Sequence, residues 1–201
     1  MLICLRGTNS SGKSYPLYRL VQDYPPLKEV YFPPGRIPNG NKQKDKLVGY
    51  NMPGGLFVCG EYSTRTRCGG PDNWGVPIDV MHINFLRDVV KRYPFVVYES
   101  FQGSVAKWQQ WMELADEHPT VFFQLDTPLE VCLEAVEARH ALGPRKNIPL
   151  NPKTVPNNWN GAWRIHERYV EAGYDARLMP REQSYETLIQ TLKDGGWDPW
   201  T

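Results

Sequence analysis

Apolar and polar positions along the chain follow two alternating patterns: short continuous apolar runs, and longer stretches with helical periodicity. The apolar runs occupy residues 2–5, 95–98 and 120–125. Apolar side chains recur every three or four residues in the stretches 13–23, 77–92, 104–117 and 127–141. Strands without polar alternation that are separated by helices belong to parallel sheets covered on both faces. We therefore predict an α/β fold.

Proline, glycine and capping residues mark further elements. Pro25-Pro26 and Pro33-Pro34 bound a predicted strand at 28–32, and Pro53-Gly54-Gly55 is the turn of a predicted hairpin. Thr127-Pro128-Leu129-Glu130 is a capping box with proline at the first helical position. The remaining predictions are hairpin strands at 47–51 and 56–60, a helix at 158–172 capped by Asn158, a strand at 175–179 and a closing helix at 184–193.

Residues 33–77 differ in character from the rest of the chain. They contain nine glycines and six prolines, which excludes long helices there. They also carry six Lys or Arg against three acidic residues. We expect this stretch to be an irregular insert that binds an acceptor substrate, within a single domain formed by residues 1–201.

The first apolar run leads directly into a phosphate-binding motif. Residues 7–14, GTNSSGKS, have the form G-x-x-x-x-G-K-S, with a strand pattern before them and a helical pattern after them. In such a P-loop the backbone N–H groups and the lysine hold phosphate oxygens, and the final hydroxyl ligates Mg²⁺. We expect a nucleoside triphosphate with Mg²⁺, held by Asn9, Ser10, Ser11, Gly12, Lys13 and Ser14. The alternative is a Gly/Ser turn with a solvated lysine.

Two carboxylates are candidates for the chemistry of phosphoryl transfer. Glu99 ends an apolar run, where the carboxyl end of a parallel strand would meet the P-loop, so it is a candidate for orienting Mg²⁺ or acting as a base. Asp72 follows Gly69-Gly70-Pro71; there Gly70 would let the backbone approach a ligand closely, and Asp72 would face the acceptor hydroxyl. The structural alternatives are a solvated loop residue for Glu99 and an ordinary turn for Asp72.

Aromatic and basic residues of the insert are candidates for binding the acceptor. Tyr62 and Trp74 are candidates to stack on a base, with local packing as the alternative. Arg36 and Arg67 offer the planar forks that bind phosphate.

A basic, proline-rich segment at 139–158 has the character of a lid. Six Lys or Arg and one acidic residue lie between Arg139 and Arg168, although a solvated basic face would look the same. We expect Arg139 and Arg145 to neutralise a transferred phosphoryl group. Along the next helix one face collects residues whose spacing favours a core position: Trp159, Trp163, His166 and Val170.

Composition excludes several other classes of protein. The net charge of +1 gives no global attraction for a polyanion, so any contact with DNA depends on local patches. The four cysteines form no C-x-x-C pair and the four histidines are scattered, so neither a zinc site nor a disulfide framework is indicated. No apolar run approaches the ~20 residues of a membrane span, and a core strand begins at Leu2. We expect a cytoplasmic protein with no membrane contact and no evident protein partner.

Several of these motifs together resemble the P-loop kinases of the nucleoside monophosphate kinase superfamily. LRGTNSSGKS, FVVYES and FQLDTPLEVCLEAVEARH carry that resemblance over most of the chain. GEYSTRTRCGGPDNWG and PLNPKTV are similar, more narrowly, to bacteriophage kinases assigned as 5-hydroxymethyluracil DNA kinases. The chain departs from the family at Arg139-His140, where paired arginines are common, and this leaves the second lid charge to Arg145 or Lys146.

The resemblance implies a P-loop NTPase fold and an ATP- and Mg²⁺-dependent phosphotransferase. Its acceptor would be the hydroxymethyl group of 5-hydroxymethyluracil in DNA, with the base flipped or single-stranded and Asp72 activating the hydroxyl; a phage-encoded chain would act in the host cytoplasm. Two alternatives stay open. A free deoxynucleoside monophosphate kinase would grip its acceptor with Arg36, Arg65 and Arg67. A non-enzymatic nucleotide-binding switch would have no need of lid arginines.

Overall fold

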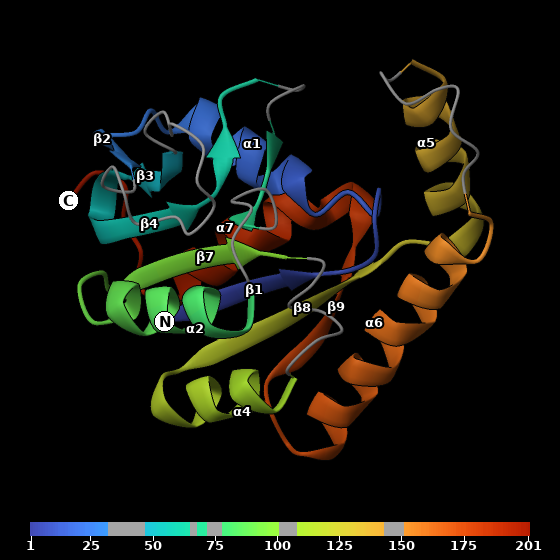
Figure 1. The fold of residues 1–201 in the computed structure, drawn as a ribbon. Coiled ribbons are helices and arrows are strands. Elements are labelled where there is room, and N and C mark those ends of the chain that lie inside the picture. Colours follow the sequence, from blue (N-terminus) through green and yellow to red (C-terminus); the bar gives the residue numbers. More distant parts are fainter. Residues whose placement is uncertain (32–46, 65–67, 72–77, 101–107, 143–150) are drawn as a thin grey trace, which may run out of the picture.

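A seven-stranded sheet forms the centre of the molecule (Figure 1). The structure is a computed structural model and describes residues 1–31, 47–64, 68–71, 78–100, 108–142 and 151–201. The strand order is β2-β3-β4-β7-β1-β8-β9. The predicted α/β fold with a sheet flanked by helices is therefore confirmed in its coarse form.

Five neighbouring strands of this sheet are parallel. They are β4 (Leu56–Cys59), β7 (Phe95–Glu99), β1 (Leu2–Arg6), β8 (Thr120–Asp126) and β9 (Ala176–Pro180). β1, β4 and β7 read as nearly unbroken apolar sequence because helices cover the sheet on both faces. Their carboxyl ends meet at one edge, where Leu5 of β1 lies opposite Glu99 of β7. This register brings the loop at residues 7–14 and the carboxylate of Glu99 to the same edge of the sheet.

The other edge of the sheet is antiparallel. β2 (Lys28–Tyr31) pairs with β3 (Leu47–Asn51), and β3 pairs with β4 through the short turn Pro53–Gly55. The predicted parallel sheet thus has an antiparallel edge, because so short a turn can join only antiparallel neighbours. The predicted hairpin is confirmed. Since β3 and β4 belong to the central sheet, the insert expected at 33–77 is not a separate region over its whole length.

Helices pack on both faces of the sheet (Figure 1). One apolar cluster joins α1 (Ser14–Asp23) and α7 (Ser184–Asp194) to the sheet, and a second cluster joins α2 (Ile78–Val90), α4 (Trp108–Glu117) and α6 (Thr154–Glu171). The remaining elements are α5 (Leu129–Leu142), the short turn Arg181–Gln183 and the hairpin of β5 (Glu61–Tyr62) and β6 (Cys68–Gly69). Among the described residues, no helix combines the length and apolar character needed to cross a bilayer.

Helix α6 begins earlier than its sequence indicates. Asn158 was expected as its cap but lies inside the helix, which starts at Thr154. The cause is a turn at Asn151, whose side-chain Oδ1 accepts a hydrogen bond from the Lys153 N–H at 3.0 Å. The Asn151 carbonyl oxygen in turn accepts one from the Thr154 N–H at 3.1 Å. His166 on this helix is buried, as predicted. Burial lowers the pKa of its imidazole, and the nearby positive charge of Arg6 lowers it further.

A buried cation ties α6 to the end of β1. Arg6 is 3% exposed, and its guanidinium carbon lies 4.5 Å from the ring centroid of Tyr169. Tyr169 stacks in turn on Phe122 of β8, with 4.3 Å between ring centroids. Because Arg6 directly precedes Gly7, this stack helps to fix the point where the glycine-rich segment leaves the sheet.

We expect Tyr169→Leu to lower the free energy of unfolding by about 2–4 kcal/mol, because Arg6 and Phe122 both lose their contact with the Tyr169 ring. Tyr169→Phe is the matched control. It keeps the ring and removes only a long hydrogen bond of 3.4 Å to the Trp108 carbonyl, so the loss should stay below about 1 kcal/mol. Urea denaturation of the three proteins measures both values, and equal losses in the two variants would contradict a role for the ring.

Candidate active site

The segment between β1 and α1 curls into a compact loop. Gly7, Ser10 and Gly12 have positive φ angles of 149°, 62° and 100°. A Cβ on Gly7 would lie 2.6 Å from Ser11 Oγ, so the loop needs glycine at this position. The Ser11 N–H donates to the Thr8 carbonyl at 3.3 Å, which closes the loop.

The side chains of this loop have unused hydrogen-bonding capacity. Lys13 is 9% exposed, and its Nζ donates to the Thr8 carbonyl at 3.1 Å across the loop. Thr8 Oγ1 and Ser11 Oγ are buried and have no hydrogen-bond partner in the part of the chain that the structure describes. A buried hydroxyl without a partner costs about 1–3 kcal/mol, so a ligand with several acceptor oxygens would relieve that cost. The loop therefore fits a phosphate group.

Ser14 and Glu99 form the closest polar contact of the site. Ser14 Oγ donates to Glu99 Oε1 at 2.6 Å, and Glu99 is 2% exposed at the carboxyl end of β7. Hydroxyl and carboxylate oxygens suit Mg²⁺, which proteins commonly hold through one or two side chains together with substrate phosphates. No cluster of three or more His, Cys, Asp or Glu that could hold a metal occurs among the described residues. The donor set thus fits a shared magnesium ion better than a protein-only metal cage.

Tyr62 lies against Glu99 from the β5–β6 hairpin. Its side chain is 0% exposed, and its Oη lies 3.2 Å from Glu99 Oε1 and 3.1 Å from the Cys59 carbonyl oxygen. Burial raises the pKa of Tyr62 well above its ordinary value, and the charge of Glu99 raises it further. The expectation that Tyr62 stacks on a base is therefore corrected, because the ring is enclosed in the core and offers no face to a ligand.

Gly70 also lies against Glu99. A Cβ on Gly70 would be 2.2 Å from the Glu99 carbonyl oxygen and 2.8 Å from Glu99 Cγ. The sequence predicted a close approach at this glycine, but to a bound ligand. The structure shows the close approach to be internal, to the candidate metal-orienting residue. Pro71 is buried next to it, and Asp72 follows outside the described residues.

Arg181 was not predicted as a site residue. Its side-chain Cγ and Nε lie 3.4 Å from the position that a Cβ on Gly12 would take. Burial raises the pKa of Cys132 in α5, whereas the positive charges of Arg181 and Lys13 lower it, so both cations lie near Cys132. The available signal was the position of Arg181 directly after the last predicted strand, at the edge where the other site residues gather.

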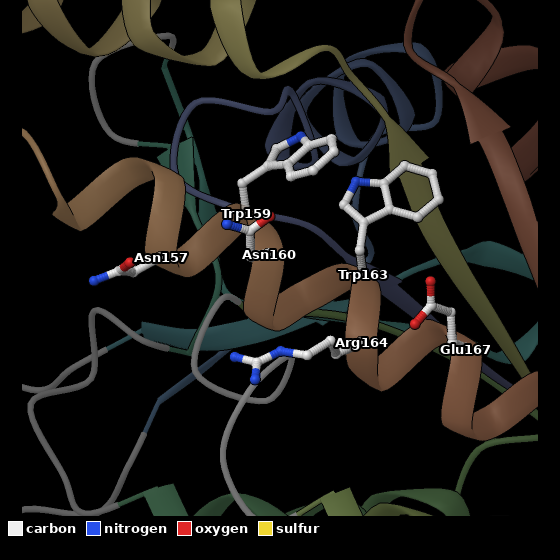
Figure 2. A pocket seen from close by; sticks show the side chains of 6 residues that line it. All are labelled: Asn157, Trp159, Asn160, Trp163, Arg164 and Glu167. Carbon is white, nitrogen blue, oxygen red and sulfur yellow. The ribbon is translucent and has the colours of Figure 1, made fainter.

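A hydrogen-bonded bridge joins α6 to the loop. Thr127 Oγ1 donates to the Ser11 carbonyl at 2.8 Å, and Trp159 Nε1 donates to the Thr127 carbonyl at 2.9 Å. Trp159 and Trp163 were expected in the core; they are half-buried and project to the same side of α6 (Figure 2). They line a hollow of about 680 Å³ together with Arg164. Sequence reasoning missed Thr127 and Trp159 as supports of the loop.

The remaining predicted site residues are not brought together by the described structure. Arg139 lies exposed in the last turn of α5. Five others fall outside the described residues: Arg36, Arg67, Asp72, Trp74 and Arg145.

The fold and the site together define a mixed α/β protein with polar site residues gathered at one edge of its sheet. The carboxyl edge of its mostly parallel sheet carries a glycine-rich loop, a buried lysine and a paired hydroxyl and carboxylate. No family model matches the chain. The chain is similar to a protein named 5-hmdU DNA kinase from Pseudomonas phage PaMx11, with 27% identity over 192 residues, which are 96% of this chain and 97% of that protein. The resemblance to phage kinases inferred from the sequence motifs is confirmed.

Proposed function

We propose that the chain is a P-loop kinase that transfers the γ-phosphoryl group of ATP to the 5-hydroxymethyl group of a modified pyrimidine in DNA. The observation that carries this proposal is the 2.6 Å hydrogen bond between Ser14 and Glu99, next to a loop with two unpartnered hydroxyls. The name of the phage PaMx11 relative supports the choice of acceptor. The function would belong to a single domain formed by residues 1–201.

The loop would hold the phosphates of the nucleotide. Its backbone N–H groups from Asn9 to Gly12 face a common centre in such loops, and Lys13 would exchange its bond to the Thr8 carbonyl for phosphate oxygens. Ser14 and Glu99 would hold Mg²⁺, which when bound neutralises phosphate charge. Arg181 adds a second cation beside Gly12.

The transfer step needs a proton acceptor and positive charge. In our proposal the acceptor hydroxyl gives its proton to the Asp72 carboxylate as its oxygen bonds to the γ-phosphorus. The bond from that phosphorus to the bridging oxygen breaks, and ADP leaves with the electron pair. Arg139 and Arg145 would move over the phosphoryl group from the lid at 139–158 and neutralise it.

The acceptor would be bound by residues of the segment 33–77. Arg36 and Arg67 would contact the DNA backbone, and Trp74 would stack on the target base or its neighbour. Gly70 would serve this region indirectly, by letting the segment that leads to Asp72 lie against Glu99.

A transfer screen tests the reaction and the acceptor together. We expect label from γ-³²P-ATP to enter DNA that contains 5-hydroxymethyluracil, and not plain DNA or free deoxynucleotides. Lys13→Ala should lower the rate about 100-fold or more, because a preorganised cation at the phosphates is lost. Lys193→Ala, which removes an exposed lysine of α7, is the matched control and should keep the parental rate.

Two other outcomes of this screen would contradict the proposal. Efficient labelling of a deoxynucleoside monophosphate with hydroxymethyluracil DNA unlabelled would replace the proposal by a free nucleotide kinase. Nucleotide binding without transfer to any acceptor would identify a nucleotide-binding switch.

The two carboxylates should give different kinetic effects. Asp72→Asn should lower kcat by about 10²–10⁴ with ATP binding unchanged, since only proton transfer is affected. Glu99→Gln should instead weaken the response to Mg²⁺, and excess Mg²⁺ should restore part of the rate. Steady-state kinetics at several Mg²⁺ concentrations separate the two. Parental activity of Asp72→Asn would assign the base to Glu99 and return Asp72 to a turn.

Salt should weaken the binding of a DNA acceptor steeply. Each phosphate contacted by an arginine or lysine contributes roughly −0.7 to −0.9 to the slope of log affinity against log salt concentration. Fluorescence anisotropy with a labelled oligonucleotide measures this slope, and Arg36→Ala and Arg67→Ala should each make it shallower. We also expect single-stranded or mismatched substrate to react at least as fast as a paired duplex. A flat salt response would contradict a polymeric acceptor.

A further inference from the structure

We propose that Tyr62 is a positioning residue that holds the Glu99 carboxylate in the orientation required for the metal. Its hydroxyl lies 3.2 Å from Glu99 Oε1, and the whole side chain is buried. The inference rests on the proposed function, because it assigns Tyr62 a part in the same site. This positioning role takes the place of the predicted stacking of Tyr62 on a base.

The oxygen that Tyr62 contacts is the one that Ser14 contacts. Ser14 Oγ, at the start of α1, donates a hydrogen bond to Glu99 Oε1 at 2.6 Å. Tyr62 Oη approaches the same oxygen from strand β5. Donors from α1 and from the β5–β6 hairpin thus fix one carboxylate oxygen between them. Partners behind a metal ligand orient it and tune its affinity in this way.

Tyr62 can act only as a neutral hydrogen-bond donor to Glu99. The ring is fully enclosed, and burial together with the Glu99 charge keeps the pKa of the hydroxyl well above its ordinary value. Its single proton has two acceptors in reach, Glu99 Oε1 and the Cys59 carbonyl oxygen.

The backbone around Tyr62 is fixed as firmly as its ring. The Tyr62 N–H donates to Tyr50 Oη at 2.9 Å, which anchors the hairpin to β3 of the central sheet. Cys68 on the partner strand of the hairpin donates from Sγ to the Ser14 carbonyl at 3.5 Å. Gly70 then lies against the Glu99 backbone. The hairpin thus contacts both Ser14 and Glu99, which a strand pair serving only the acceptor would not need to do.

Tyr62→Phe and Tyr169→Phe are a matched pair for the test. Each removes the hydroxyl of a buried tyrosine, but the Tyr62 hydroxyl contacts Glu99, whereas the Tyr169 hydroxyl contacts the Trp108 carbonyl. The direct readout is the affinity for Mn²⁺ in the presence of ADP, measured by calorimetry on the whole chain. Loss of an outer-shell partner should weaken Mn²⁺ binding about 10-fold in Tyr62→Phe. Tyr169→Phe should bind Mn²⁺ as the parent does, even if it melts at a lower temperature.

Kinetics give a second readout. In Tyr62→Phe the Mg²⁺ concentration for half-maximal transfer should rise by the same factor, with KM for ATP at saturating Mg²⁺ unchanged. In the double variant with Glu99→Gln the two losses should not add, because Tyr62 acts through Glu99. Additive losses would overturn the inference.

The outcomes separate this inference from the proposed function. If the parent binds no Mn²⁺ with ADP, the proposed function fails and the inference falls with it. If the parent binds Mn²⁺ and Tyr62→Phe binds it equally well, the positioning role is overturned while the proposed function stands. Equal weakening in Tyr62→Phe and Tyr169→Phe would assign both hydroxyls to general stability and would also overturn it.

Discussion

The parallel pairing of β1 with β7 is the constraint on which the rest of the site depends. Its register sets Leu5 opposite Glu99, so the loop that follows β1 and the carboxylate that ends β7 arrive at the same edge of the sheet. The first residue of α1 then lies within 2.6 Å of that carboxylate. A shift of one residue in this register would turn Glu99 toward the other face of the sheet.

A buried carboxylate at such an edge must be solvated by the protein itself. Hydroxyls from Ser14 and Tyr62 supply hydrogen bonds, and the close approach of Gly70 excludes solvent on a further side. The glycine-rich loop poses the opposite problem, because its hydroxyls at Thr8 and Ser11 are buried without partners in the described structure. The site therefore combines an anion that is already hydrogen-bonded with hydroxyls that have no partner among the described residues, an asymmetry that supports our proposal of phosphate binding.

Local signals in the sequence were sufficient for most of the fold. Apolar runs and turn residues predicted the strands and the Pro53–Gly55 hairpin, because these elements depend on nearby residues. The start of α6 was missed because it is set by a side-chain turn at Asn151 and not by a cap at Asn158. Arg181 and Tyr62 could not be placed, since their neighbours Gly12 and Glu99 come from distant parts of the chain. The position of Glu99 beside the loop was predicted for two reasons. Its place at the end of an apolar run is visible in the local sequence, and the carboxyl ends of parallel strands meet at one edge of a sheet.

The close approach at Gly70 has a consequence for how mutational scans of this protein are interpreted. Every substitution at this position adds at least a Cβ, and that atom would overlap the backbone of Glu99. A scan that selects for activity will therefore tolerate only glycine there, close in sequence to Asp72, for which we propose a role toward the acceptor. The intolerance would look like substrate recognition, although its origin is a steric clash with Glu99. Sensitivity to substitution along residues 68–72 thus reports two different requirements that sequence adjacency alone would merge.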